Sequence, residues 1–255
     1  MAEIDQTGLL HGVGFAFVIA ALHSVAAIIF QVRRQRNGRR VRVRRPKRFA
    51  VRLALTQIAL LVMLGLTHRA GFWTLSSVGV SNQVEPLVAF AAGFGEYFLF
   101  AWACSAFAVG VGAMRAYSTA ALRANALLLQ PWRAQRALVL GVLSLANPVT
   151  EELYFRGLLV YQFHSLGAPL GIAIGLGAVV SSLNHAYQGR VLVLFHLAFY
   201  ASAVALLYSP LGLCGAIGLH FAADVMPWLG YRKQLSHYRA MRRQARRAKP
   251  PQTRS

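Results

Sequence analysis

The sequence predicts an all-α protein, a polytopic bundle of about seven to eight transmembrane helices. Apolar residues make up 56% of the 255 residues, and the mean hydropathy is +0.48. This content is too high for an ordinary soluble domain, and several apolar runs are long enough to cross a bilayer. Basic residues are concentrated beside these runs, as expected of loops that remain on the cytoplasmic side of a membrane.

The net charge of +20 has an uneven distribution. Eleven of the 27 Lys and Arg residues lie between Arg33 and Arg52, and nine more follow Tyr231. Both stretches are predicted to face the cytoplasm and the anionic lipid head groups, which places the N-terminus outside. A nucleic-acid partner is not predicted, because the cations are not interleaved with aromatic residues on a soluble domain.

Seven apolar segments account for the predicted bundle. They cover approximately residues 8–32, 49–66, 85–114, 137–163, 170–187, 191–208 and 211–230. We divide the chain into N-terminal membrane helices with a basic cytoplasmic loop (1–136), a membrane core (137–230) and a basic cytoplasmic tail (231–255). Within the first part, residues 115–136 are amphiphilic and predict a helix or loop at the cytoplasmic surface.

Glycines in two of these segments predict close helix contacts. Small residues let helix backbones approach each other in membranes. The positions are Gly93, Gly95, Gly110 and Gly112 in the third segment, and Gly171, Gly175 and Gly177 in the fifth.

The stretch NPVTEELYFRG, which begins at Asn147, places two adjacent glutamates in an apolar segment of a chain with only seven carboxylates. Ionisable residues at membrane depth are costly and usually functional. Asn147 could cap a helix that has Pro148 in its first turn, so the segment is either one helix kinked at Pro148 or two short helices that meet there. Glu152 and Arg156 are four residues apart and can pair, whereas Glu151 points elsewhere and stays available.

Other polar side chains occur in the later spans. His185 lies in the fifth, and His220 and Asp224 lie four residues apart on one face of the seventh. A glutamate, two histidines and an aspartate that converge among apolar helices favour general-base hydrolysis or metal binding over simple packing. His164 and His196 have no partner at a regular spacing, so we interpret them as interior or interfacial groups.

The order of these residues resembles that of a known family. EExxxR at Glu151, a histidine about thirty residues later (His185) and HxxxD from His220 to Asp224 resemble the CPBP family of intramembrane proteases, also called the Abi or CAAX-protease family. The resemblance covers roughly residues 137 to 230. Ser181 stands where the family's FxxxH motif has phenylalanine, and Asp224 stands where many members have asparagine.

The resemblance implies roles for the residues of the first two motifs. Glu151 and His185 would activate a water molecule for attack on a peptide carbonyl, and Glu152 and Arg156 would support them. Amide hydrolysis needs a base that works near neutral pH in a water-poor cavity, which agrees with these roles. We expect this cavity to open toward the cytoplasm, because water must enter.

The resemblance also implies that His220 and Asp224 stabilise the oxyanion or orient the groups that do so. The same four side chains, Glu151, His185, His220 and Asp224, are plausible ligands of a divalent metal such as zinc. The sequence has no HExxH motif. We favour a mechanism without a cofactor, and the metal site remains the alternative.

The predicted function is an integral-membrane endopeptidase that acts on a membrane-associated peptide or protein. A prenylated tail, a leader peptide and a C-terminal sorting signal are the substrate classes considered. A non-proteolytic immunity or scaffold protein of the same fold is one alternative. A proton-coupled transporter is another, although the paired halves typical of transporters are not evident.

Overall fold

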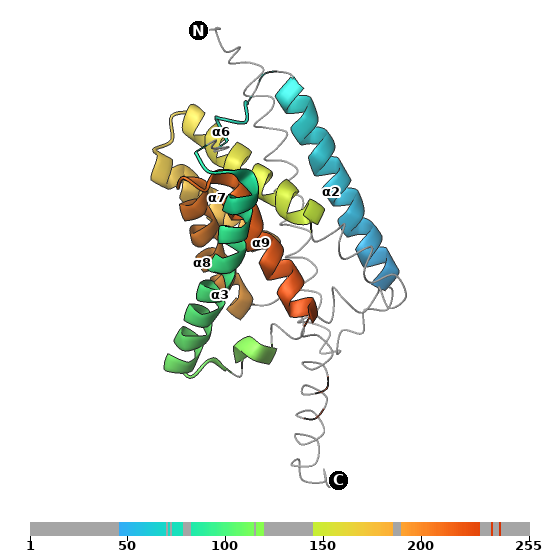
Figure 1. Ribbon diagram of the computed structural model, residues 1–255. Coiled ribbons are helices and arrows are strands. Elements are labelled where there is room, and N and C mark those ends of the chain that lie inside the picture. The colour runs from blue at the N-terminus through green and yellow to red at the C-terminus, as the bar shows by residue number, and fades with distance from the viewer. Residues whose placement is uncertain are drawn as a thin grey trace.

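The computed structural model describes residues 46–69, 71, 73–78, 83–114, 116–119, 145–185, 190–229, 236 and 240. The regular structure of these residues is entirely helical, which confirms the all-α prediction for this part of the chain. The elements are α2 (Pro46–Arg69), α3 (Pro86–Gly110), η2 (Glu152–Leu158), α6 (Leu159–Ser165), α7 (Leu170–Asn184), α8 (Arg190–Leu207) and α9 (Gly212–Leu229). Figure 1 shows α2 standing beside a group formed by α3, α7, α8 and α9.

The predicted helices at 49–66, 85–114, 170–187, 191–208 and 211–230 correspond to α2, α3, α7, α8 and α9. Local chemistry explains one of these starts. Pro86 is the first residue of α3, and the Glu85 carboxylate accepts a hydrogen bond of 2.9 Å from the Val88 amide. The predicted span at 8–32, most of the basic loop and of the surface helix at 115–136, and the tail except residues 236 and 240 lie outside the described residues.

The fourth predicted segment is not two short helices that meet at Pro148. The described helix is continuous from residue 145 to residue 165, and its irregular part is the π-helical segment η2. It does not break at Pro148, and Asn147 is helical, so Asn147 is not an N-cap. A π-helical turn holds an extra residue, and such turns are frequent at functional sites. The irregularity therefore begins at Glu152, directly after Glu151.

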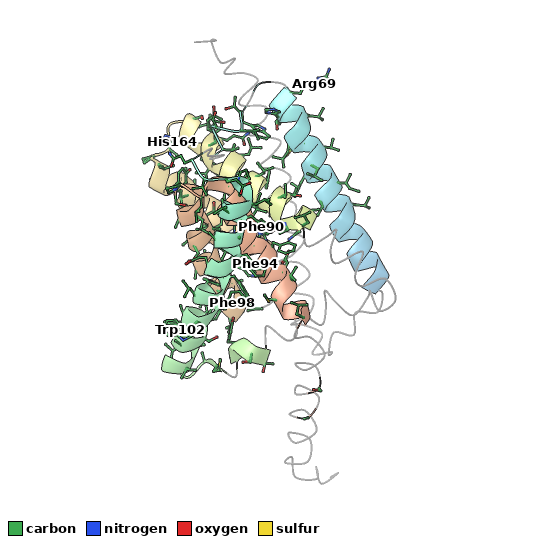
Figure 2. All side chains as sticks on the ribbon, in the orientation of Figure 1. Arg69, Phe90, Phe94, Phe98, Trp102 and His164 are labelled. Atoms are coloured by element: carbon green, nitrogen blue, oxygen red, sulfur yellow. The ribbon has the colours of Figure 1, made fainter. Side chains whose placement is uncertain are left out.

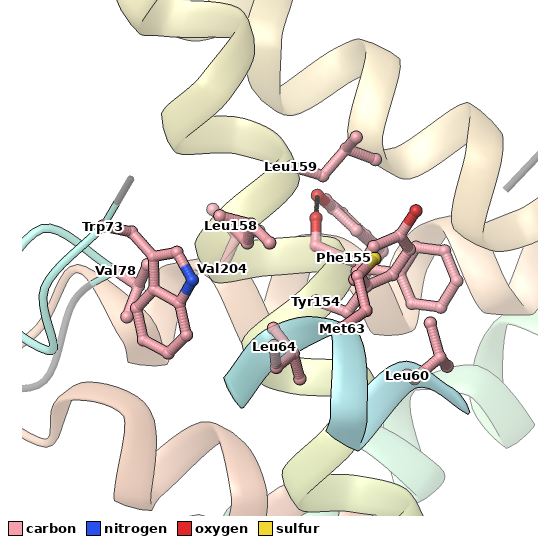
Figure 3. Packing of buried hydrophobic residues seen from close by; sticks show 11 residues of the cluster. Leu60, Met63, Leu64, Trp73, Val78, Tyr154, Phe155, Leu158, Leu159 and Val204 are labelled. Carbon is pink, nitrogen blue, oxygen red and sulfur yellow. Dashed lines mark hydrogen bonds between the residues drawn. The ribbon is translucent and has the colours of Figure 1, made fainter. Parts of the chain in front are cut away.

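An apolar cluster holds η2 in place (Figure 3). Its buried members are Leu60, Met63, Leu64, Trp73, Val78, Tyr154, Phe155, Leu158, Leu159, Tyr200 and Val204. The Tyr200 hydroxyl donates a hydrogen bond of 2.9 Å to the Phe155 carbonyl, which ties α8 to η2. Gly157 leaves room for the loop after α2, since a Cβ there would lie 2.9 Å from the Cβ of Val78. These contacts fix η2 between α2 and α8.

Glycine permits the closest packing in the bundle, between α3 and α9. A Cβ added at Gly93 would lie 1.9 Å from the Gly215 carbonyl oxygen, and one at Gly218 would lie 2.1 Å from the Phe90 carbonyl oxygen. The predicted contact is therefore confirmed for Gly93. Among the described residues, a Cβ at Gly95 or Gly110 would meet nothing within 4 Å, so no close contact is seen at those two positions.

Two further glycine predictions have different outcomes. Gly177 on α7 is closely packed, since a Cβ there would lie 2.2 Å from the Tyr200 hydroxyl. Gly171 and Gly175 have no such close neighbour in the part of the chain that the structure describes. Gly112 follows α3 with a φ of 67°, which indicates a turn position that favours glycine.

Among the described helices, α3 is the one that is long and apolar enough to cross a membrane by length and composition. Its outward face is strongly apolar, and Trp102 is 72% exposed (Figure 2). Four shorter apolar helical stretches lie in α2, α7, α8 and α9. An aqueous environment would make such exposed apolar surface costly.

Candidate active site

The two adjacent glutamates have different environments. The Glu152 side chain is fully buried, and its Oε1 lies 2.6 Å from Nη1 of Arg156. The Glu151 side chain is 13% exposed and points away from this pair. The pairing predicted from the four-residue spacing is therefore confirmed, and Glu151 is the glutamate that remains accessible.

Glu152 also contacts the last of the predicted motifs. Nδ1 of His220, on α9, lies 2.6 Å from the same Glu152 Oε1 that Arg156 contacts. The Arg156 guanidinium in turn lies over the ring of Tyr200, 4.7 Å from its centroid. A charged group enclosed in this way is held by both its counter-ion and the aromatic face. Glu152 thus joins η2 to α9 at the centre of the site.

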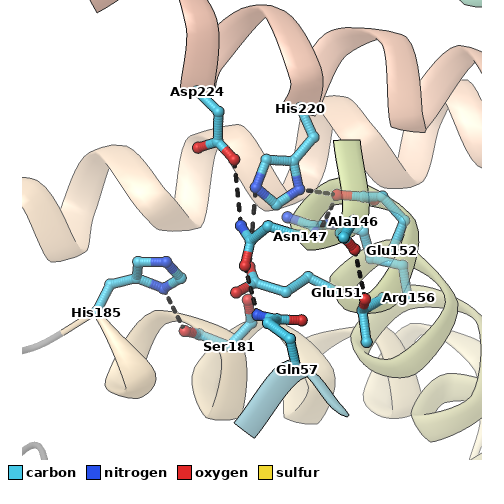
Figure 4. A network of polar contacts seen from close by, with 11 residues as sticks. Gln57, Ala146, Asn147, Glu151, Glu152, Arg156, Ser181, His185, His220 and Asp224 are labelled. Carbon is cyan, nitrogen blue, oxygen red and sulfur yellow. Dashed lines mark hydrogen bonds and ion pairs between the residues drawn. The ribbon is translucent and has the colours of Figure 1, made fainter. Parts of the chain in front are cut away.

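The second nitrogen of His220 faces Glu151 (Figure 4). Nε2 lies 3.8 Å from Glu151 Oε2, which is longer than a hydrogen bond. The Glu152 carboxylate fixes Nδ1 as the donor of its contact, since an ionised carboxylate can only accept. The orientation of the ring is therefore set from the buried side, and Nε2 is directed to the accessible side.

His185 terminates α7 as its C-cap residue. Its Nδ1 lies 3.0 Å from the Ser181 carbonyl oxygen. The rings of His185 and His196 stack with centroids 3.8 Å apart and an angle of 26° between their planes. His196 is interior, as expected, but its partner is a candidate catalytic residue. No spacing in the sequence could reveal this pair, because its members lie on α7 and α8.

Asp224 forms its hydrogen bond with Asn147. Its Oδ2 accepts a hydrogen bond of 3.2 Å from Nδ2 of Asn147, and Asn147 Oδ1 accepts one of 2.5 Å from Nε2 of Gln57. The residue that holds Nδ1 of His220 is Glu152. Sequence reasoning missed Gln57 altogether.

The described residues do not fit the metal alternative. No group of three His, Cys, Asp or Glu side chains in the described part of the chain is arranged to hold a metal ion. We therefore derive no chemical step through a metal.

A match to a protein-family model agrees with the resemblance seen in the motifs. Residues 133–226 match the model of the Rce1-like family, described as type II CAAX prenyl endopeptidase Rce1-like. This match supports membership of the chain in the CAAX-protease (CPBP) family. The match includes Glu151, His185, His220 and Asp224, and the predicted region of resemblance, 137–230, is nearly the same. Gln57 lies outside the part of the chain that carries the CAAX-protease motifs.

No curated protein and no solved structure matches the chain.

Proposed function

We propose that this CAAX-protease family member is an intramembrane endopeptidase that hydrolyses a peptide bond of a membrane-associated protein or peptide. The observation that carries the proposal is the different environment of the two glutamates. Glu152 is buried and holds His220, whereas Glu151 is accessible and lies 3.8 Å from Nε2 of the same ring. An accessible carboxylate beside an oriented imidazole is the arrangement that general-base hydrolysis requires.

In this mechanism Glu151 and His185 activate water. When His185 is neutral and its Nδ1 donates to the Ser181 carbonyl, Nε2 is left as the basic atom of the ring. Glu151 accepts a proton from water as the water oxygen bonds to the peptide carbonyl carbon. The proton then passes to the leaving nitrogen as the carbon–nitrogen bond breaks, which returns Glu151 to its starting state.

His220 acts on the developing oxyanion, whereas the acceptor-only carboxylate of Asp224 can act there only by orienting other groups. His220 donates from Nε2 only when both ring nitrogens are protonated, and the adjacent Glu152 carboxylate stabilises that charged form by direct attraction. Donors fixed in advance and aimed at developing charge supply a large part of catalysis in acyl transfer. Arg156 supports this arrangement because it balances the buried charge of Glu152.

The membrane assignment is also part of the proposal. The family match, the outward apolar face of α3 and the shorter apolar helices support a multi-pass bundle. We place residues 137–230 as the catalytic core, with residues 1–136 as further membrane helices and the basic loop. Residues 33–48 and 231–255 lie at the anionic cytoplasmic surface, and the cavity opens to that side.

A comparison of membrane peptidomes tests the function. Cells that express the parent chain are compared with cells that express Glu151→Gln, which keeps the shape of the side chain but cannot accept the proton. The expected result is a set of cleavage products that appears only with the parent, with the turnover of any purified substrate reduced about 10²–10⁴-fold in Glu151→Gln. A panel of prenylated, leader and sorting-signal peptides then identifies the substrate class.

Matched controls make the comparison decisive. Glu151→Gln must reach the same membrane abundance and the same unfolding temperature as the parent. Identical peptidomes under these conditions contradict the protease proposal and favour an immunity or scaffold role. Activity of Glu151→Gln near that of the parent removes Glu151 as the base and directs attention to the histidines.

A further inference from the structure

Helix α2 lies outside the matched CAAX-protease region but contributes a polar side chain to the site. Gln57 is 4% exposed, whereas the neighbouring inward residues Leu60, Met63 and Leu64 are apolar members of the cluster around η2. A buried amide among apolar residues is costly unless it forms hydrogen bonds. The buried Gln57 amide is therefore expected to form hydrogen bonds within the protein.

The hydrogen bonds of Gln57 lead to Asp224. Nε2 of Gln57 donates to Oδ1 of Asn147, and Nδ2 of Asn147 donates to Oδ2 of Asp224 (Figure 4). The three residues come from α2, the helical turn that precedes η2, and α9. Two hydrogen bonds thus connect the N-terminal part of the chain with a candidate residue of the oxyanion site.

The carboxylate of Asp224 determines which groups donate and which accept in these two hydrogen bonds. An ionised carboxylate only accepts, so Asn147 must turn its amino group toward Asp224. Its carbonyl oxygen then faces α2, where a donor is needed. Glutamine supplies that donor, whereas leucine or methionine of similar size would leave the Asn147 carbonyl free to rotate.

We propose that Gln57 is a positioning residue that orients Asp224 through Asn147. Gln57 does not contact the reacting atoms. It holds the Asn147 amide so that the Asp224 carboxylate stays beside His220, one helical turn earlier on α9. The effect on turnover rests on the proposed function, but the hydrogen-bond arrangement itself does not.

Kinetic variants test the positioning role. Gln57→Leu and Gln57→Met remove the donor and keep the volume, and each is expected to lower kcat about 10-fold with KM unchanged. Thr67→Val is the matched control on α2, because it removes a buried hydroxyl that bonds Met63 and Trp73 away from the site. It is expected to lower the unfolding temperature and to leave kcat within about two-fold.

A double variant separates positioning from simple packing. Gln57→Leu, Asn147→Leu and their combination are compared with the parent. If Gln57 acts through Asn147, the combination loses no more kcat than Asn147→Leu alone, because coupled residues are not additive. If the loss of kcat in the double variant equals the product of the two single losses, the proposal is overturned. It is also overturned if Gln57→Leu and Gln57→Met both have the kcat of the parent. If neither Gln57 variant folds while Thr67→Val does, the role of Gln57 is structural and the proposal fails.

An infrared measurement is independent of peptide cleavage. The carboxylate band of Asp224 is assigned by subtraction of the Asp224→Asn spectrum and is then followed in Gln57→Leu and Thr67→Val. The band is expected to shift in Gln57→Leu and to remain in place in Thr67→Val. If the parent cleaves no peptide but the band still shifts in Gln57→Leu, the hydrogen bonds from Gln57 to Asp224 are supported and the protease function is rejected. If the band does not shift in Gln57→Leu, the proposed hydrogen-bond link from Gln57 to Asp224 is rejected, whatever the activity.

Discussion

The Nδ1 atom of His220 lies 2.6 Å from Oε1 of Glu152, although the two residues are 68 positions apart. Glu152 is fully buried, and the same oxygen receives Nη1 of Arg156 at 2.6 Å. One carboxylate oxygen therefore carries both the ion pair that neutralises it and the contact that orients His220. Folding of η2 and orientation of the site depend on the same atom.

Arg156→Ala is expected to reduce both the folded yield and the activity. Removal of one partner from a fully buried pair costs about 3–5 kcal/mol, because it leaves an uncompensated charge. The yield is measured by size-exclusion chromatography in detergent and the stability by thermal unfolding. If Arg156→Ala folds like the parent and only its affinity for substrate falls, Arg156 is a substrate contact.

The combination of Glu152→Arg with Arg156→Glu is expected to recover part of the folded yield, since opposite charges again face each other. It is not expected to recover activity, because the guanidinium at position 152 then faces Nδ1 of His220 in place of a carboxylate. Measurement of yield and cleavage on the same preparation checks both statements. Full recovery of cleavage contradicts the role given to Glu152.

His196 is expected to affect turnover through His185. His196→Ala removes the ring that stacks on His185, so kcat should fall about 10-fold as the imidazole gains other orientations. His196→Phe keeps an aromatic face and should retain most of the activity. His164→Ala, on the exposed end of α6, is the control. Equal losses in the Phe and Ala variants mean that the imidazole of His196 itself takes part.

Asp224→Asn is expected to retain substantial activity, whereas Asp224→Leu and His220→Ala lose most of it. An asparagine carbonyl can accept the same hydrogen bond from Asn147 Nδ2, so the link to α2 survives the change. Leucine breaks this link. Rates of peptide cleavage for the three variants check the order.

The Asp224→Asn variant also tests the metal alternative. A neutral amide in place of an anionic ligand weakens metal binding, so a metal enzyme would become dependent on added metal. Cleavage is measured with and without a chelator. An inactive Asp224→Asn variant that excess divalent metal restores would overturn the cofactor-free mechanism.

The orientation in the membrane can be measured by cysteine labelling. Single cysteines in residues 1–7, 33–48 and 232–255 are introduced into a chain in which Cys104 and Cys214 are replaced by alanine. Only residues 1–7 should react with an impermeant reagent from outside intact cells, because the basic segments stay in the cytoplasm. Labelling of the tail from outside reverses the orientation and the side on which the cavity opens.

The sequence predicted the helices well where their apolar runs are long. The structure places α2, α3, α7, α8 and α9 within a few residues of the predicted ends, because length and apolar content suffice to define such segments. The Glu152–Arg156 pair also followed from spacing alone. The sequence did not predict the π-helical turn at Glu152–Leu158, since its geometry arises from packing against α2 and α8.

By itself, the sequence determined the contacts that a single helix can make and the set of chemical groups available. The pairing of Glu152 with Arg156 belongs to this category. Only the tertiary structure decided which groups meet across helices: Glu152 with His220, His185 with His196, and Gln57 with Asn147. The physical reason is that a helical period relates residues within one element, whereas contacts between elements depend on packing and on where glycine lets α3 and α9 approach.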